Sequence, residues 1–203
     1  MAITTTYNGI EYRSRLEARW AAFMQNIGWD IIYEPFDGDG YIPDFLVQGE
    51  RPFLVEVKPA VTQKEYEAAV PKAESGLAKH WRHDILIVGA GPFPQRMGNS
   101  CSTTNSIYPT PTAGWLGEFF SEDVFSPLEQ SDTSPGWDWD AAEWITCGHC
   151  GSIAVYHTTM SFGGRPCWCV SGGDHHLGAI PVKAVQSMWA DACNDVKWRG
   201  TAA

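Results

Sequence analysis

The run Tyr41-Ile-Pro-Asp-Phe-Leu-Val-Gln48 is followed, after Gly49-Glu50-Arg51, by Pro52-Phe-Leu-Val-Glu-Val-Lys58. In both runs every second side chain is apolar, which is typical of strands in a half-buried sheet. The segment between them is short enough to turn the second strand antiparallel to the first. The two runs therefore predict a β-hairpin, and this hairpin is the centre of the predicted fold.

The apolar residues indicate the register of this hairpin, because a slip of one residue would move every side chain to the opposite face. Pairing Gln48 with Pro52 gathers four apolar residues on one face, namely Phe45, Val47, Phe53 and Val55. The same register sets Asp44 directly opposite Glu56, with side chains about 5 Å apart, and places Lys58 on their face. We therefore expect two carboxylates and an amine to lie side by side.

This group of side chains suits the hydrolysis of a phosphodiester. That reaction needs a nucleophilic water near neutral pH and positive charge near the phosphoryl oxygens, and Mg²⁺ or Mn²⁺ bound by Asp44 and Glu56 supplies both. Lys58 adds a point charge and can orient or deprotonate the water. The alternative is a surface hairpin whose charged face only meets water.

The flanking sequence predicts an α/β core. Apolar residues recur at helical spacing upstream of the hairpin, and Gly28 supplies a stop for that helix. Downstream, Thr62-Gln-Lys-Glu65 is typical of a helix N-terminus. In chain order we expect a helix at about 11–27, a strand at 30–34, the hairpin, a helix from 62 to about 70 with Pro71 opening a continuation, and a buried strand at 84–89.

Four motifs stand in the order found in the PD-(D/E)XK nuclease superfamily: Ser14-Arg-Leu-Glu17, Tyr33-Glu-Pro35, Ile42-Pro-Asp44-Phe45 and Val55-Glu-Val-Lys-Pro59. Over about residues 7 to 90 the chain resembles most the TnsA-type transposon endonucleases and related phage nucleases. The resemblance implies a restriction-endonuclease-like core, a mixed sheet flanked by helices, over residues 1–92. It implies that Asp44 and Glu56 bind metal, that Lys58 is the catalytic lysine, and that Glu17 faces the metal or its water. The resemblance alone favours DNA over RNA as the substrate.

Two interpretations of Glu17 stay open. Ser14-x-x-Glu17 is also a capping box, in which the glutamate turns back to the backbone at the helix start. Asn8-x-x-Glu11 offers a competing start one turn earlier. If the helix begins near Asn8, Glu17 is free to point at the metal.

A second motif, Cys147-Gly-His-Cys150-Gly151, is followed by Cys167-Trp-Cys169. A Cys-x-x-Cys-Gly turn presents two thiolates, and the second pair can complete a tetrahedral site. We expect structural Zn²⁺ on Cys147, Cys150, Cys167 and Cys169, in a zinc-ribbon region over 141–203 with a strand at 152–157 and a helix at 181–198. His149, His157, His175 or His176 can replace one thiol. Disulfides, or a redox pair at Cys147 and Cys150, are the alternatives.

Between these two regions we expect a connecting segment over 93–140, rich first in Pro, Gly and Ser and then in acidic residues. Residues 116–143 hold eight acidic side chains and no Lys or Arg. They predict a solvated loop or linker, or alternatively a partner-binding segment that mimics phosphate charge and restrains the nuclease. A nuclease-fold protein with little activity that binds a partner through this segment and the zinc ribbon, or inhibits as a DNA mimic, is the alternative function.

Whole-chain properties bound these expectations. The chain has 203 residues, 44% of them hydrophobic, which allows a sizeable core. It lacks a membrane-length apolar run and a secretory-type start, so we expect a cytoplasmic protein. The net charge of -10, from 14 Lys+Arg and 24 Asp+Glu, opposes the basic surface usual in nucleic-acid enzymes.

Overall fold

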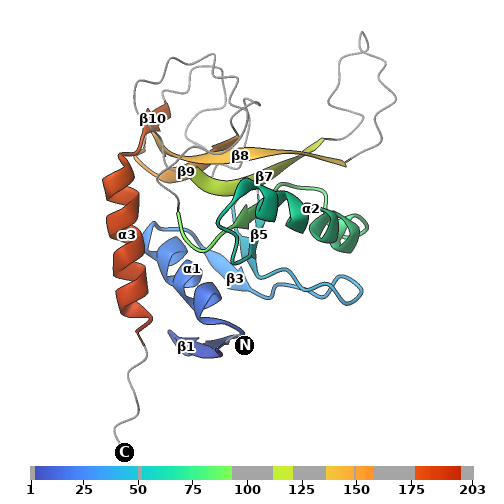
Figure 1. Cartoon of the computed structure of the whole chain (residues 1–203), viewed down its shortest axis with the longest axis horizontal. Helices are drawn as coiled ribbons and strands as arrows, with labels where there is room; N and C mark the ends of the chain where they lie inside the picture. The colour runs from blue at the N-terminus through green and yellow to red at the C-terminus, as the bar shows by residue number, and fades with distance from the viewer. Residues whose placement is uncertain are drawn as a thin grey trace, which may run out of the picture.

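The protein has a mixed α/β fold (Figure 1). A computed structural model describes residues 3–49, 52–92, 112–120, 136–148, 150–157 and 177–197. In chain order the elements are β1 (Thr5–Tyr7), β2 (Ile10–Tyr12), α1 (Arg15–Asn26), β3 (Ile31–Tyr33), β4 (Phe45–Val47), β5 (Phe53–Val57), α2 (Gln63–Leu77), β6 (Ile85–Val88), β7 (Thr112–Phe120), β8 (Gly136–Cys147), β9 (Ile153–His157), β10 (Leu177–Ala179) and α3 (Val182–Asp195).

Eight strands form one mixed sheet. Its order is β10-β8-β7-β6-β5-β4-β3, and β9 pairs with β8 outside this path. β5 and β6 are parallel, whereas the other neighbours are antiparallel. α2 is the crossover between the parallel strands, because such strands cannot be joined by a tight turn. The expected mixed sheet with helices is therefore confirmed.

The predicted register of the central hairpin is correct. Phe45 pairs with Val55 and Val47 pairs with Phe53. The first strand is shorter than the predicted 41–48, and Pro43 gives a reason, since it has no N–H to donate to a ladder. β5 is buried along its whole length rather than half buried.

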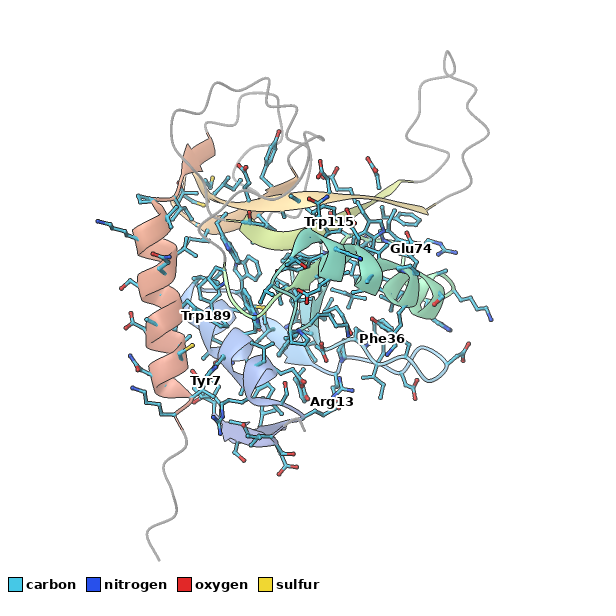
Figure 2. The ribbon with its side chains drawn as sticks, in the orientation of Figure 1. Tyr7, Arg13, Phe36, Glu74, Trp115 and Trp189 are labelled. Atoms are coloured by element: carbon cyan, nitrogen blue, oxygen red, sulfur yellow. The ribbon has the colours of Figure 1, made fainter. Side chains whose placement is uncertain are left out.

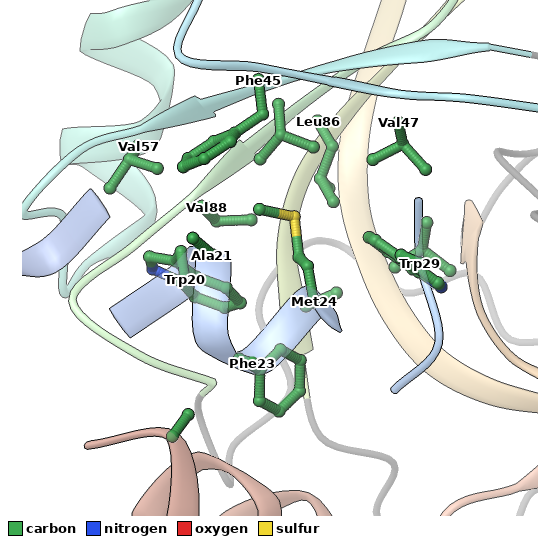
Figure 3. Packing of buried hydrophobic residues seen from close by; sticks show 14 of the residues in the cluster. Trp20, Ala21, Phe23, Met24, Trp29, Phe45, Val47, Val57, Leu86 and Val88 are labelled. Atoms are coloured by element: carbon green, nitrogen blue, oxygen red, sulfur yellow. The ribbon is translucent and has the colours of Figure 1, made fainter. Parts of the chain in front are cut away.

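Both faces of β5 are buried because a helix covers each side (Figure 1). α1 packs on the face that carries Phe45 and Val55, and Figure 3 shows Trp20, Phe23 and Met24 of this helix against the strands. α2 covers the opposite face with three buried side chains, Tyr66, Ala73 and Leu77. Burial of side chains of this size supplies most of the stability of such a core.

The first helix begins later than predicted. Its N-cap is Ser14, and the preceding residues form a hairpin of β1 and β2 that turns at Asn8 and Gly9. Both turn residues have positive φ, 48° and 79°, which is the geometry that Asn-Gly favours in tight hairpins. Tyr12 packs in the α1 core although it belongs to β2, so the periodicity continued past the true helix start.

α2 matches its predicted start but not its predicted end. The Glu65 carboxylate accepts the backbone N–H of Thr62, at 2.9 Å, and of Val61, at 2.7 Å. The helix then continues through Pro71 to Leu77 rather than restarting there. The predicted strands 30–34 and 84–89 are present as β3 and β6.

The interpretation of residues 116–143 as a loop or linker is wrong where the structure describes them. Residues 112–120 and 136–147 are β7 and β8, which pair with each other and continue the sheet beyond β6. Trp137-Asp-Trp-Asp140 alternates as a strand does, so its acidic residues share one face. Residues 93–111 and 121–135 of the expected connecting segment lie outside the described residues.

The C-terminal helix is present as α3, and it packs on α1 (Figure 1). The Trp189 ring lies 4.7 Å from Trp20 and 5.9 Å from Phe23, measured between ring centroids. The strand expected at 152–157 is β9. Within the described ranges, every helix is too short or too polar to cross a lipid bilayer.

Candidate active site

The four residues of the predicted catalytic site come from three elements that meet near one end of the central strands. Asp44 precedes β4, Glu56 lies in β5 and Lys58 follows it, whereas Glu17 is in the first turn of α1. Glu17, Asp44 and Glu56 are buried, each less than a tenth exposed. Buried carboxylates are uncommon unless they are paired or bind an ion.

Asp44 is tied to the strand that carries Glu56. Its Oδ2 accepts the backbone N–H of Val57 at 2.7 Å, and its own carbonyl accepts the N–H of Glu34 at 2.9 Å. The bond to Glu34 extends the β3–β4 pairing beyond the start of β4, and the bond from Val57 joins the Asp44 side chain to the backbone of β5. The side chain of Asp44 is therefore held beside Glu56 by the backbone of β5 and does not depend on a flexible loop.

Glu56 has one engaged and one unengaged oxygen. Oε1 pairs with the ammonium of Lys58. Oε2 is buried and has no hydrogen-bond partner among the described residues. The Tyr41 hydroxyl is near enough for Glu56 to raise the pKa of this phenol, after burial as the larger cause, but the geometry falls short of a hydrogen bond. An unengaged buried carboxylate oxygen costs free energy unless something binds it.

The electrostatics of the site disfavour a second negative charge. Burial, and next the Glu56 carboxylate, raise the pKa of Asp44 to about 7. The Val57 N–H and the Lys58 ammonium act in the opposite direction but do not cancel this rise. A cation between two such carboxylates would lower the cost of ionising both.

Arg13 is a further member of the site that no sequence motif indicated. Its Nη2 lies 2.7 Å from Asp44 Oδ1, and its Nε lies 2.7 Å from Glu34 Oε1. Figure 2 shows Arg13 where the β1–β2 hairpin meets α1. Burial disfavours its charge, but Tyr33, Asp44, Glu34 and Glu17 together raise its pKa, so the guanidinium stays protonated.

Glu17 takes part in the N-terminal cap of α1 through its backbone, while its carboxylate accepts hydrogen bonds from two hydroxyl groups. Its backbone N–H donates to Ser14 Oγ at 3.1 Å, which is the N-cap bond. Its carboxylate accepts the Ser14 hydroxyl at Oε1 and the Tyr33 hydroxyl at Oε2, each at 2.7 Å. Since both oxygens are engaged, Glu17 acts on Asp44 through its charge and through Arg13, whose Nε is 3.9 Å away.

Asp44 and Glu56 fit a divalent cation as a pair of ligands rather than as a complete cage. Among the residues that the structure describes, no three His, Cys, Asp or Glu side chains group closely enough to hold a metal. Mg²⁺ usually takes one or two carboxylates and completes its shell with water and substrate phosphate. The unengaged Glu56 Oε2 is a ligand atom of the right kind.

The expected zinc ligands are described only in part. Cys147 ends β8 and is buried, whereas Cys150 is exposed in the turn that leads to β9. Gly151, at φ 75°, donates its N–H to the Cys147 carbonyl at 2.8 Å. Cys167 and Cys169 lie outside the described residues. The turn brings the first two cysteines to one end of the sheet, as the motif predicts.

Comparison of the chain with protein-family models, with curated proteins and with solved structures gives no match in any of the three.

Proposed function

We propose that this protein is a metal-dependent endonuclease that hydrolyses phosphodiester bonds in DNA, with a restriction-endonuclease-like core. The observation that carries the proposal is the buried pair Asp44 and Glu56 with Lys58 on Glu56 and one carboxylate oxygen unengaged. A structural core rarely retains this combination, because each buried charge must be compensated. The resemblance of the four ordered motifs supports the same activity.

Each side chain has a role that follows from its position. Asp44 and Glu56 hold Mg²⁺ or Mn²⁺, which lowers the pKa of a bound water and neutralises charge on the phosphoryl oxygens. Lys58, next to Glu56, is placed to orient or deprotonate the attacking water. Glu17 adds negative charge near Asp44, and its carboxylate accepts the hydrogen bond of the Tyr33 hydroxyl.

The proposal includes Zn²⁺ as a structural ion on Cys147, Cys150, Cys167 and Cys169. Four protein ligands would leave no open position, so this ion would stabilise the end of the sheet and take no part in hydrolysis. Three of the acids of this acidic chain, Glu17, Asp44 and Glu56, are buried at the proposed site, where a cation would offset part of their charge.

Incubation of the purified protein with supercoiled plasmid, linear duplex and single-stranded RNA, with Mg²⁺, Mn²⁺ or EDTA, tests the proposal. We expect metal-dependent nicking of DNA that Asp44→Ala and Lys58→Ala abolish. Lys64→Ala is the matched control, because Lys64 also carries one positive charge but lies on the exposed face of α2. Nicking that persists in both site variants would refute the site. A folded wild type without cleavage would favour the partner-binding alternative.

A further inference from the structure

The guanidinium of Arg13 bridges two carboxylates of different exposure. Its side chain is 52% exposed, whereas the side chain of Asp44 is 7% exposed and that of Glu34 is 33% exposed. Arg13 thus reaches from the surface into the buried site and ends on the Oδ1 atom of Asp44. The other oxygen, Oδ2, is taken by the Val57 N–H. A cation can therefore bind Asp44 at Oδ1 without breaking the Val57 bond, and Arg13 occupies that oxygen in this structure.

A cation on Asp44 would meet the positive charge of Arg13 at close range. Two positive charges that share one carboxylate oxygen repel each other strongly in a partly buried site. Among the described residues, the ion pairs of Glu17, Glu34, Asp44 and Glu56 involve two basic groups, Arg13 and Lys58. The site thus lacks positive charge that a divalent ion would supply, and Arg13 compensates Asp44 in the absence of that ion.

Arg13 can leave Asp44 without disturbing the helix that follows it. Its backbone N–H donates to the Tyr33 hydroxyl at 2.9 Å, and the same hydroxyl donates to Glu17. These bonds fix the main chain independently of the guanidinium. Glu34 remains as a partner at 2.7 Å, so the displaced side chain keeps one ion pair. Its motion needs only side-chain rotation at a half-exposed position.

We propose that Arg13 occupies the cation's position on Asp44 in the metal-free protein and turns to the substrate phosphodiester when the cation binds. A guanidinium suits this second contact, because its planar fork matches the oxygens of a phosphate. Its half-exposed side chain, next to a buried carboxylate, can contact a phosphate that arrives from solvent. This inference rests on the proposed function and assigns Arg13 a positioning and phosphate-binding role within it.

Two equilibrium measurements test the inference without relying on cleavage. The first is titration with Mn²⁺, followed by the EPR signal of the unbound ion. The second is the anisotropy of a labelled DNA duplex in Ca²⁺, with the duplex verified to stay intact. We expect Arg13→Ala to bind Mn²⁺ about three- to thirtyfold tighter than wild type, because a competing cation is gone. We expect its affinity for DNA to fall about five- to tenfold.

Arg82→Ala is the control for the loss of one positive charge. Arg82 is exposed after the C-terminal end of α2, where it contacts backbone carbonyls and the Phe119 ring. We expect it to leave Mn²⁺ affinity unchanged. Arg13→Lys, which keeps the charge but lacks the fork, should restore Mn²⁺ affinity toward wild type and DNA affinity only in part. Arg13→Gln takes the place of Arg13→Ala if the alanine variant does not fold.

The outcomes separate this inference from the proposed function. Mn²⁺ affinity that is unchanged or weaker in the folded Arg13 variant overturns the inference, as does DNA affinity that is unchanged. Either result leaves the nuclease proposal standing if Asp44→Asn still abolishes Mn²⁺ binding. If wild type binds no Mn²⁺ that depends on Asp44, both the inference and the proposed function are wrong.

Discussion

The carboxylate of Asp44 accepts the backbone N–H of Val57 at 2.7 Å, next to Glu56 on the same strand. This bond predicts different effects for two substitutions. Asp44→Asn keeps an acceptor oxygen, whereas Asp44→Ala leaves a buried N–H without a partner, which costs about 1–3 kcal/mol. We expect urea unfolding to show Asp44→Ala as the less stable variant and cleavage to be lost in both. Equal stability of the two variants would show that the bond contributes little.

The raised pKa of Asp44 predicts how the stability of the metal-free protein changes with pH. The folded state holds this proton up to a pKa of about 7, whereas the ordinary value is 3.8. Between these values the folded protein binds more protons than the unfolded chain, so the free energy of unfolding should fall as the pH rises from about 4 to 7. Asp44→Asn should flatten this slope, measured by urea unfolding at a series of pH values.

The affinity for the cation should rise with pH, whereas the stability of the metal-free protein should fall. The proton on Asp44 competes with the metal, and so the apparent Mn²⁺ affinity should increase up to about tenfold per pH unit below pH 7 and level off above it. Isothermal titration between pH 5.5 and 8.5 measures this dependence. An affinity that does not change over this range would contradict a raised pKa of Asp44 in the metal-free protein.

Glu17 and Glu56 should differ in their importance for cleavage. Both oxygens of Glu17 accept hydroxyl hydrogen bonds, whereas Oε2 of Glu56 is unengaged. We expect Glu56→Gln to lower the single-turnover rate by about a hundredfold or more, and Glu17→Gln by about tenfold or less. Glu67→Gln, on the exposed face of α2, is the control. A larger loss for Glu17→Gln would mean that Glu17 binds the cation directly.

Gly76 of α2 is expected to resist a substitution that normally stabilises helices. A Cβ at this position would lie 2.4 Å from the Cγ of Tyr41, the residue whose hydroxyl is near Glu56. In most helix interiors Gly→Ala gains up to about 1 kcal/mol. Here we expect Gly76→Ala to lose about 1–3 kcal/mol through overpacking and to lower cleavage. Ser75→Ala, at an exposed neighbouring position, should change neither quantity by much.

The zinc proposal predicts a metal content that depends on cysteines far apart in the sequence. We expect about one Zn²⁺ per chain by elemental analysis, lost in Cys147→Ser and in Cys167→Ser alike, while Cys193→Ser keeps it. Cys193 lies on α3, and burial raises the pKa of its thiol, which disfavours the thiolate form that binds zinc. Retention of zinc in both ligand variants would refute the assignment.

Local patterns predicted the central hairpin well, because its register depends only on alternation and a short turn. The pairs Phe45–Val55 and Val47–Phe53 follow from the period of two, and extending this register by one residue sets Asp44 opposite Glu56. The helix start was missed because Tyr12 continues the helical spacing while lying in β2. Asn8-Gly9 is typical of a tight hairpin turn, but Asn8 also fits the start of a helix, and the sequence alone favoured the helix.

Two other features depended on tertiary structure. The acidic residues of Trp137-Asp-Trp-Asp140 suggested a solvated loop, but this stretch pairs with β7, and its two tryptophans pack partly buried against the sheet. Arg13 belongs to no motif, since its partners Glu34 and Asp44 come from other elements. Only the fold, which brings the start of α1 to the start of β4, places Arg13 on the site.

The proposed cleavage depends on one cation shared by Asp44 and Glu56. Anomalous diffraction from a crystal soaked in Mn²⁺ tests this sharing most directly. We predict a peak within about 2.0–2.5 Å of a carboxylate oxygen from each residue, with the guanidinium of Arg13 moved away from Asp44. A map without a peak between the two carboxylates, or with Arg13 still on Asp44 beside a bound ion, would contradict it.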